Sequence, residues 1–370
     1  MNRLTTVHFA APRSFIAMPL ARLFTHCLLR PADVTPSQQD LQVVGAFNPG
    51  VTTLGTEILV LVRVAEAPAE TRPGWVGLPR WDLAENKVVI DWVREDEVIR
   101  DDTRSVRFKR DGIVRLTFVS HLCLARSRDG RSIDEVGTTR FFPSSAVEDY
   151  GVEDPRITKI DETFFITYVG VSKHGPATLL ATTHDFLTFH RHGIIFCPDN
   201  KDIVLFPERI DGRYFALHRP SISAPLTRPE IWLASSPDAL NWGRHRPLHG
   251  GTRPWEIGKV GAGAPPFRTP AGWLELYHGN DRGHQDTRVG RYSGGLLLLA
   301  LDDPSRILAT SDAILVPEAD FELEGFVSDI VFPTGIVRQG DTVLVYYGAA
   351  DSVTGVTEFR LQDLLAAVGQ

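Results

Sequence analysis

A proline-containing segment recurs five times along the chain, and strand-like residues follow it each time. The segments are AFNPG (46–50), VEDPR (152–156), LFPER (205–209), GAPPF (263–267) and VFPTG (331–335). Proline fixes φ and lacks a backbone N–H, so we interpret each segment as a turn that opens a new structural unit. Units of roughly 40–50 residues with several strands each are typical of β-propeller blades. The repeat therefore predicts a five-bladed propeller.

Runs of aromatic and β-branched residues fill the chain between these segments. Examples are TEILVLVRV (56–64), TFFITYVGV (163–171) and DTVLVYYGAA (341–350), each bounded by residues typical of turns. With 31 Gly and 25 Pro in 370 residues, little room is left for long helices. Helical periodicity occurs in the last dozen residues and, less clearly, over 21–29. The chain is therefore predicted to be all-β.

We expect one propeller domain over residues 1–370. In this interpretation, 1–40 is an N-terminal closing segment and 356–370 is a C-terminal helix. The first two proline segments are far apart, so the first unit must hold extra strands or an insertion, and we expect its charged stretch 92–110 to be solvated. A pair of β-sandwiches is the alternative architecture, but it gives no reason for five similar segments.

Composition and missing motifs exclude several classes of protein. Acidic residues outnumber basic ones by 46 to 39, for a net charge of −7, so we expect no nucleic-acid partner. The longest apolar runs are strand-sized, whereas a membrane span needs about 20 apolar residues. We expect no membrane attachment, no signal peptide and a cytoplasmic location.

The motifs of several cofactor and nucleophile classes are also missing from the sequence. It has no nucleophile elbow, no phosphate-binding P-loop and no dinucleotide fingerprint. His190 and His192 could face one side of a strand, but no further metal-ligand pattern accompanies them. We therefore expect neither a metal site nor an organic cofactor.

Polar residues gather in the repeated segments and at the ends of the strands that follow them. Those in the segments or a few residues before them are Asn48, Glu153, Asp154, Arg156, Lys201, Asp202, Glu208 and Arg209. Those at strand ends are His218, Arg219, Tyr277, His278, Tyr346, Tyr347 and Asp351. The loops of a propeller converge on one channel mouth, and such aromatic and basic groups suit a sugar or an anion. The alternative is structural: an ion pair or turn cap at Asp154 and Arg156, and packed histidines.

These segments resemble the motif series of glycoside hydrolase family 130. The resemblance is carried, in order over about residues 40–355, by AFNPG with LVRV, GVEDPRI, KDIVLFPERIDGRYFALHRP, SPDALNWG, KVGAGAPP with GWLELYHG, VFPTG and VYYGAAD. That family comprises inverting β-mannoside phosphorylases together with some β-mannosidases. The resemblance implies a five-bladed propeller that acts on a β-mannoside oligosaccharide, and it is compatible with a homo-oligomer.

The resemblance also implies roles for individual residues. Asp154 in VEDPR matches the family's proton donor, whose proton can pass through a hydroxyl of the bound mannose. Basic groups near the phosphate pocket are implied at Lys201, Arg219 and His278, with Arg63 in LVRV as a further candidate. The candidate contacts to the sugar are Asn48, Arg156, Tyr277 and Asp351.

Two nucleophiles remain open for an inverting reaction. Inorganic phosphate as co-substrate needs cations to hold it in line, and the product is then α-mannose 1-phosphate. Water needs a second carboxylate about 6.5–9.5 Å from the acid, for which Glu230 and Glu275 are candidates. We expect phosphorolysis, because a hydrolase gains little from several desolvated cations. The alternatives are an inverting exo-β-mannosidase and a non-catalytic, lectin-like sugar-binding propeller.

Overall fold

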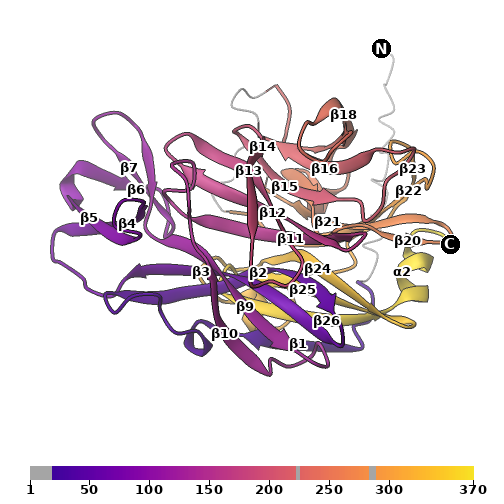
Figure 1. Ribbon diagram of the computed structural model, residues 1–370, viewed down its shortest axis with the longest axis horizontal. Helices are drawn as coiled ribbons and strands as arrows, with labels where there is room; N and C mark the ends of the chain where they lie inside the picture. The colour runs from indigo at the N-terminus through magenta and orange to yellow at the C-terminus, as the bar shows by residue number, and fades with distance from the viewer. Residues whose placement is uncertain (1–18, 222–225, 283–288) are drawn as a thin grey trace, which may run out of the picture.

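Sheets of antiparallel strands dominate the computed structural model, which describes residues 19–221, 226–282 and 289–370 (Figure 1). The α-helices in these parts of the chain are short: α1 spans Asp320–Leu323 and α2 spans Leu361–Ala367. The same described ranges contain 3₁₀ turns at Pro31–Asp33, Glu95–Glu97 and Pro254–Glu256. The prediction of an all-β chain is confirmed.

In the described residues, five sheets each contain a row of four strands, and four of these sheets are built from strands in nearly consecutive order. The first sheet contains β2 (Leu41–Leu54), β3 (Glu57–Pro68), β9 (Val119–Ser127) and β10 (Glu135–Phe141). The second contains β11 (Val152–Ile160), β12 (Thr163–Ser172), β13 (Gly175–Thr183) and β14 (His190–Phe196). The third contains β15 (Asn200–Leu205), β16 (Tyr214–Pro220), β17 (Ile231–Ser236) and β18 (Gly243–His249). The fourth contains β19 (Lys259–Ala262), β21 (Gly272–Asn280), β22 (Tyr292–Leu299) and β23 (Ile307–Thr310), with β20 (Phe267–Thr269) beside β21.

The fifth sheet joins strands from both ends of the described chain. It contains β24 (Val331–Gln339), β25 (Thr342–Ala349), β26 (Val353–Arg360) and β1 (Phe24–Leu29). Strand β1 pairs antiparallel with β26, and Phe24 lies opposite Glu358. Within the stretch 21–29, Phe24–Leu29 therefore forms a strand rather than part of a helix. The C-terminal helix begins only at 361, because residues 353–360 are held between two strands.

Apolar clusters fill the space between sheets that follow each other in the chain. In β3, Leu59 and Leu61 pack toward the second sheet, whereas Val60 and Val62 pack toward the fifth. Side chains alternate between the two faces of a strand, so the uninterrupted apolar run in β3 reflects burial on both faces. Further clusters join the second sheet to the third, the third to the fourth, and the fourth to the fifth.

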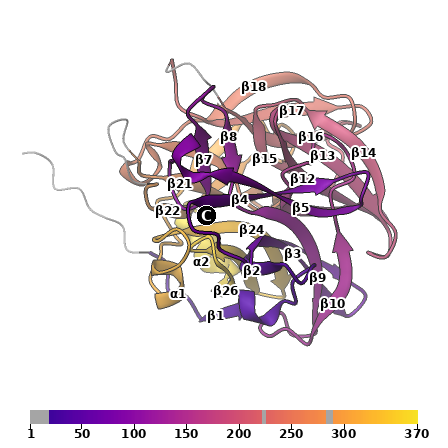
Figure 2. The ribbon, with the colours of Figure 1, turned by 90° about the vertical axis from the view of Figure 1, so that its left-hand side faces the viewer.

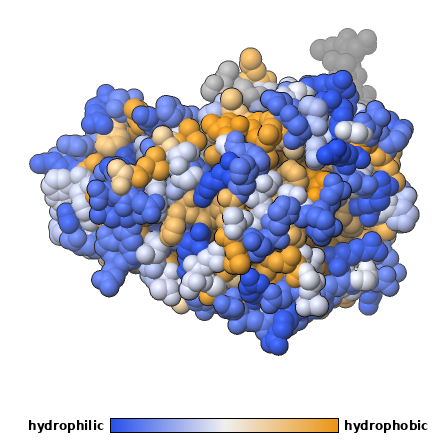
Figure 3. Space-filling model, in the orientation of Figure 1, coloured by the Kyte–Doolittle hydropathy of each residue, from blue (hydrophilic) through white to orange (hydrophobic). Residues whose placement is uncertain are grey.

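An insertion between β3 and β9 forms two small sheets. One pairs β4 (Trp75–Asp82) with β5 (Lys87–Arg94), and the other contains β6 (Val98–Arg100), β7 (Ser105–Phe108) and β8 (Val114–Leu116). The insertion projects at one end of the molecule, and Figure 2 views the molecule from that side. Its surface in Figure 3 is mostly hydrophilic. The extra strands expected here are present, but 92–110 is not simply solvated, because Val106 is buried and part of the stretch lines a cavity.

Three of the proline segments are bulges inside strands, which corrects their interpretation as turns. Pro49, Pro155 and Pro333 lie within β2, β11 and β24, at places where the strand register shifts. A bulge inserts an extra residue and redirects neighbouring side chains. The residues before the first two prolines, Asn48 and Asp154, have left-handed φ values of 50° and 49°. Asn and Asp are among the few residues that tolerate this conformation.

The third sheet carries its bulge away from its proline. The register shift in β15 lies between Lys201 and Val204, and Asp202 has φ 56°. Pro207 follows the strand instead of lying within it. The structural counterpart of Asn48 and Asp154 is therefore Asp202. In the described residues, no helix is long and apolar enough to cross a bilayer.

Candidate active site

A cavity of about 380 Å³ is lined by all five four-stranded sheets and by the insertion. Its charged and polar lining residues are Asn48, Arg63, Asp102, Arg104, Ser105, Glu153, Asp154, Lys201, Asp202, Arg219, Lys259, His278, Tyr292 and Asp351. Seven of the residues predicted for the site line this one cavity: Asn48, Arg63, Asp154, Lys201, Arg219, His278 and Asp351. A cavity of this size with convergent polar groups is typical of a small-molecule site.

Asp154 is held by neighbours from three other strands. Its Oδ1 accepts hydrogen bonds from Asn48 Nδ2 and from Arg63 Nη1, each at 2.8 Å. Its Oδ2 lies 3.6 Å from Lys201 Nζ. Burial alone would raise the pKa of this carboxyl, but the charges of Arg63 and Lys201 outweigh burial and hold the pKa well below its usual value. The carboxylate is therefore ionised at rest and must gain a proton before it can act as an acid.

Glu153 lines the same cavity, although it is the chain neighbour of Asp154. In a regular strand, adjacent side chains point to opposite faces. Here the register shift between Glu153 and Arg156 and the left-handed Asp154 bring both carboxylates to one side. Glu153 Oε1 accepts a hydrogen bond from Arg63 Nη2 at 2.7 Å. Strand alternation predicts that Glu153 points away from the site. The one sequence signal for its presence in the cavity is its place beside Asp154 in VEDPR.

Arg156 lies beneath the cavity and does not line it. Its side chain is 1% exposed, its Nη1 donates to the backbone oxygen of Asp154 at 2.8 Å, and its Nε donates to that of Gly263 at 2.9 Å. Arg156 was predicted to contact the sugar. The structure instead places it where it fixes the backbone that carries Asp154.

Two of the basic residues expected near phosphate, Arg219 and His278, meet at Asp202. Arg219 Nε and Nη2 each lie 2.7 Å from Asp202 Oδ2, and His278 Nε2 lies 3.4 Å from the same oxygen. Burial would raise the pKa of Asp202, but Arg219 and His278 hold it well below its usual value. Burial also lowers the pKa of His278 to about 4, against the opposing effect of Asp202, so this imidazole is neutral at pH 7. Asp202 was not predicted as a site residue, although its place after Lys201 in the repeat was noted.

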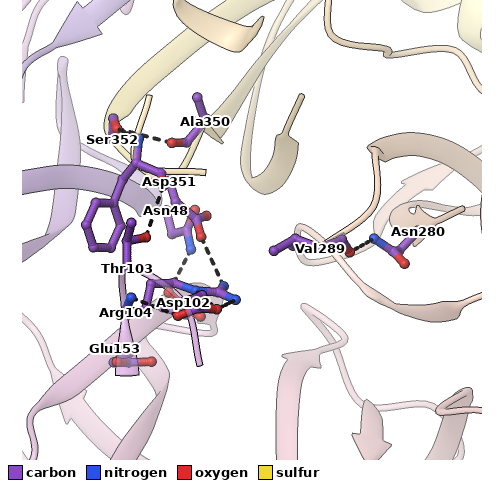
Figure 4. Close-up of polar contacts among 12 residues, drawn as sticks. Asn48, Asp102, Thr103, Arg104, Glu153, Asn280, Val289, Ala350, Asp351 and Ser352 are labelled. Atoms are coloured by element: carbon purple, nitrogen blue, oxygen red, sulfur yellow. Dashed lines mark hydrogen bonds and ion pairs between the residues drawn. The ribbon is translucent and has the colours of Figure 1, made fainter. Parts of the chain in front are cut away.

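The insertion contributes an acid–base pair to the cavity wall. Arg104 Nη2 donates to Asp102 Oδ2 at 2.7 Å, and Arg104 Nη1 lies 3.5 Å from Asp351 Oδ2 in the turn between β25 and β26. Figure 4 shows Arg104 reaching toward Asp351, with Asn48 and Glu153 nearby. Sequence reasoning missed Asp102 and Arg104, because it treated their stretch as a solvated surface.

Three other predicted site residues lie outside this cavity. Tyr277 is fully buried, and its hydroxyl donates to Glu256 Oε2 at 2.6 Å. Glu275 is also fully buried, and its Oε1 accepts from the backbone N–H of Gly263 at 3.1 Å. Burial raises the pKa of Glu275 well above its usual value, which favours the protonated form of this carboxyl. Glu230 lines a separate cavity of about 300 Å³.

No group of three or more His, Cys, Asp or Glu side chains suited to a metal ion is found among the residues that the structure describes. The groups that the main cavity itself offers are charged side chains. A carboxylate pair lies on one side, and lysine, arginine and histidine lie beside it.

Comparisons with known proteins are consistent with this geometry. The family described as β-1,4-mannooligosaccharide phosphorylase (glycoside hydrolase family 130) matches residues 114–370. A β-1,2-mannobiose phosphorylase of Listeria innocua is 39% identical over 94% of this chain and 98% of its own length. A 1,2-β-oligomannan phosphorylase of Thermoanaerobacter sp. (strain X514) is 37% identical over 67% of this chain and 81% of its own. The solved complex of β-1,2-mannobiose phosphorylase from Listeria innocua with β-1,2-mannobiose superposes with a TM-score of 0.86 at 37% identity, covering 92% of this chain and 97% of that one.

Proposed function

The chain belongs to glycoside hydrolase family 130, and we propose that it is a β-mannoside phosphorylase whose substrate is β-1,2-mannobiose. Inorganic phosphate attacks the anomeric carbon of the mannosyl unit from the α face, and the bond to the leaving oxygen breaks with inversion. The products are α-mannose 1-phosphate and mannose. The choice of the β-1,2 linkage rests on the similarity to the Listeria innocua enzyme over almost the whole of both chains.

The observation that carries this proposal is that Asp154 and the cations Lys201 and Arg219 line one cavity. In the proposed roles, Asp154 gives a proton to the leaving oxygen, either directly or through a hydroxyl of the mannose. Lys201 and Arg219 hold the attacking phosphate, and the neutral His278 donates a hydrogen bond to it. Cations fixed in a water-poor site stabilise the charge that moves during the reaction without costly reorganisation.

The positions of Glu230 and Glu275 count against hydrolysis. An inverting hydrolase needs an ionised carboxylate that activates water across the sugar from the acid. Glu275 is fully buried outside the cavity, where burial raises its pKa and disfavours the ionised form that a base needs, and Glu230 lines a different cavity. Neither candidate base is placed to activate water opposite Asp154.

We further propose that the five four-stranded sheets are the blades of one propeller domain. The support is that apolar clusters join each sheet to the next, and one cluster joins the fifth sheet to the first. In this arrangement β1 closes the ring by completing the last blade. We also propose that phosphate is the co-substrate and that turnover needs neither a metal ion nor an organic cofactor, so activity should survive dialysis against a chelator.

The deciding experiment incubates the protein with β-1,2- and β-1,4-mannobiose, each with and without phosphate. We expect α-mannose 1-phosphate and one equivalent of mannose from β-1,2-mannobiose, and only when phosphate is present. Free mannose released at equal rates with and without phosphate would establish hydrolysis instead. Binding of the sugar without turnover in either condition would indicate a lectin-like module.

A further inference from the structure

We propose that phosphate binding itself loads the proton onto the catalytic acid. The acid is the Glu153–Asp154 pair. Lys201 couples phosphate binding to this pair, because its ammonium lies beside both carboxylates and also binds the incoming phosphate. Glu153 is thus a second proton-holding residue. This inference rests on the proposed function, because it takes phosphate as the co-substrate.

The two carboxylates are joined by the same two cations. Arg63 donates to Glu153 Oε1 at 2.7 Å and to Asp154 Oδ1 at 2.8 Å, and its Nε lies 3.2 Å from the hydroxyl of Ser120. Lys201 Nζ lies 3.9 Å from Glu153 Oε2 and 3.6 Å from Asp154 Oδ2. Arg63 is therefore fixed by three contacts, whereas Lys201 contributes its charge at distances too long for hydrogen bonds.

Lys201 is also the cation that can turn toward phosphate. It lies opposite Arg219 in the pairing of β15 with β16, and its side chain is 27% exposed, whereas that of Arg63 is 8% exposed. A lysine ammonium on a four-carbon stem can change partners more easily than a guanidinium held by a bidentate contact. Incoming phosphate therefore draws Lys201 away from the carboxylate pair and leaves Arg63 in place.

The charge balance around the pair then requires a proton. The groups that face the pair or its cations are Arg63 on β3, Lys201 and Asp202 on β15, Arg156 on β11, Arg219 on β16, Asp351 after β25, and the neutral amide of Asn48 on β2. With Lys201 bound to phosphate, Glu153 and Asp154 share Arg63 beside a newly bound anion. Two buried carboxylates in such surroundings do not both stay ionised.

The behaviour of Glu153 supports this assignment. Burial raises its pKa above the usual value, although Arg63 and Lys201 oppose the shift. Asp154 and Asp351 add to the rise through their negative charges. Of the two carboxylates, Glu153 is thus the readier to accept a proton. Its charge state affects that of Asp154, because the Arg63 guanidinium donates hydrogen bonds to both carboxylates.

The proton balances over one turnover. The enzyme takes up one proton as HPO₄²⁻ binds, and that proton is held by the Glu153–Asp154 pair. When the bond from the anomeric carbon to the leaving oxygen breaks, the pair gives this proton to the oxygen and forms the hydroxyl of the released mannose. The new phosphate ester then loses the proton that HPO₄²⁻ carried in, and α-mannose 1-phosphate leaves as the dianion.

Calorimetry of phosphate binding tests the inference on the unmodified protein. Phosphate is titrated at pH 8 into the enzyme alone and into the enzyme saturated with mannose, in buffers of different ionisation enthalpy, and the ³¹P shift of bound phosphate reports its protonation state. We expect uptake of about one proton per phosphate while the bound phosphate stays dianionic. Binding without proton uptake, or uptake that converts bound phosphate to the monoanion, would overturn the inference.

Glu153→Gln tests the role of the second carboxylate. The amide oxygen can still accept the hydrogen bond from Arg63, so the geometry is preserved while the charge is lost. We expect proton uptake on phosphate binding to fall below about half of that of the unmodified protein. The alkaline limb of the kcat–pH profile should move down by about one pH unit, because the loss of a negative neighbour lowers the pKa of Asp154. The KM for mannobiose should stay within about twofold, since the sugar-facing surface keeps its shape.

Glu57→Gln is the matched control, because Glu57 pairs with Arg126 on the surface of the same sheet as Arg63. It should leave both the proton uptake and the pH profile unchanged. A pH profile of Glu153→Gln identical to that of the unmodified enzyme would contradict the role of Glu153. Phosphorolysis without proton uptake overturns this inference alone, whereas the absence of phosphorolysis overturns the proposed function.

Discussion

At the scale of single residues, the left-handed bulges explain why the site was only partly predictable. Motif resemblance identified Asp154 and Lys201 from their segments. It could not show that Glu153 and Asp202 face the same cavity, because regular strand alternation turns a neighbour of Asp154 or Lys201 away. The bulges that redirect these side chains depend on backbone φ values, which residue type favours but does not determine.

Replacement of the proposed acid, Asp154, gives the first prediction. Asp154→Asn keeps the side-chain shape and can still accept the hydrogen bond from Arg63, so the fold should persist. Turnover should fall by about 10²-fold or more, which is the scale of general acid catalysis. The measurement is the rate of α-mannose 1-phosphate release beside the thermal unfolding curve. Asp134→Asn, at an exposed pair with Arg128, is the control and should be fully active.

The second prediction concerns the side of the cavity that we propose to hold phosphate. Arg219→Lys keeps the charge that balances the buried Asp202 but loses the two-pronged contact to it. The KM for phosphate should rise by about tenfold or more, whereas the KM for mannobiose should change little. Initial rates at varied phosphate provide the measurement, and Arg126→Lys on the surface is the control. An unchanged phosphate KM would remove Arg219 from its proposed role.

At the scale of elements, the charge composition of the insertion gave a prediction that was only partly right. Its many charged residues predicted a solvated stretch over 92–110, and much of that stretch does carry exposed ion pairs. Yet the segment between β6 and β7 returns to the main body, where Thr103 donates to the backbone oxygen of Phe326. A single sequence gives no signal for such a return, because the contacts join positions more than two hundred residues apart.

The ion pairs that Arg104 makes in this segment supply the third prediction. Arg104→Gln removes the charge that joins Asp102 and Asp351, so the cavity wall should become less well fixed. We expect the KM for mannobiose to rise by about five- to tenfold, and stability to change by less than about 1 kcal/mol, because the side chain is one-third exposed. Arg107→Gln is a matched control, since it pairs with Asp101 in the same insertion but does not line the cavity.

At the scale of the whole molecule, the repeat predicted the number of main sheets for a physical reason. Each proline segment precedes apolar runs that need burial on both faces, and the part of the chain that the structure describes contains five sheets with a row of four strands each. The repeat could not indicate that β1 joins the last sheet. That pairing depends on two strands from opposite ends of the described chain, and neither carries a distinctive motif.

The fourth prediction is a loss of stability in acid. Burial lowers the pKa of His218 to about 3 and that of His278 to about 4. The unfolded chain has histidines near pKa 6.5, so it binds more protons than the folded protein below that pH. The stabilising effect of the neutral imidazoles is therefore complete above about pH 6.5 and is lost as the pH falls toward the folded values.

Denaturant unfolding at several pH values measures this effect. The free energy of unfolding should fall between pH 7 and pH 5 by an amount on the order of 2 kcal/mol for each of the two histidines. His218→Gln should flatten this dependence. His184→Gln, at an exposed histidine, should not. A free energy of unfolding that stays constant from pH 7 to pH 5 would contradict the burial of both imidazoles in neutral form.

The pairing of β1 with β26 has a consequence for how the protein is made. On the ribosome, Leu29 emerges more than three hundred residues before its partner Thr354. At roughly 5–20 residues per second, that separation corresponds to about 15–65 seconds of translation. Throughout this time the nascent chain must keep β1 from joining other exposed strand edges, which are templates for aggregation. The turn that carries Asp351 is made after every other part of the chain that lines the cavity, so a chain stalled before this turn would lack part of its cavity wall and should be inactive.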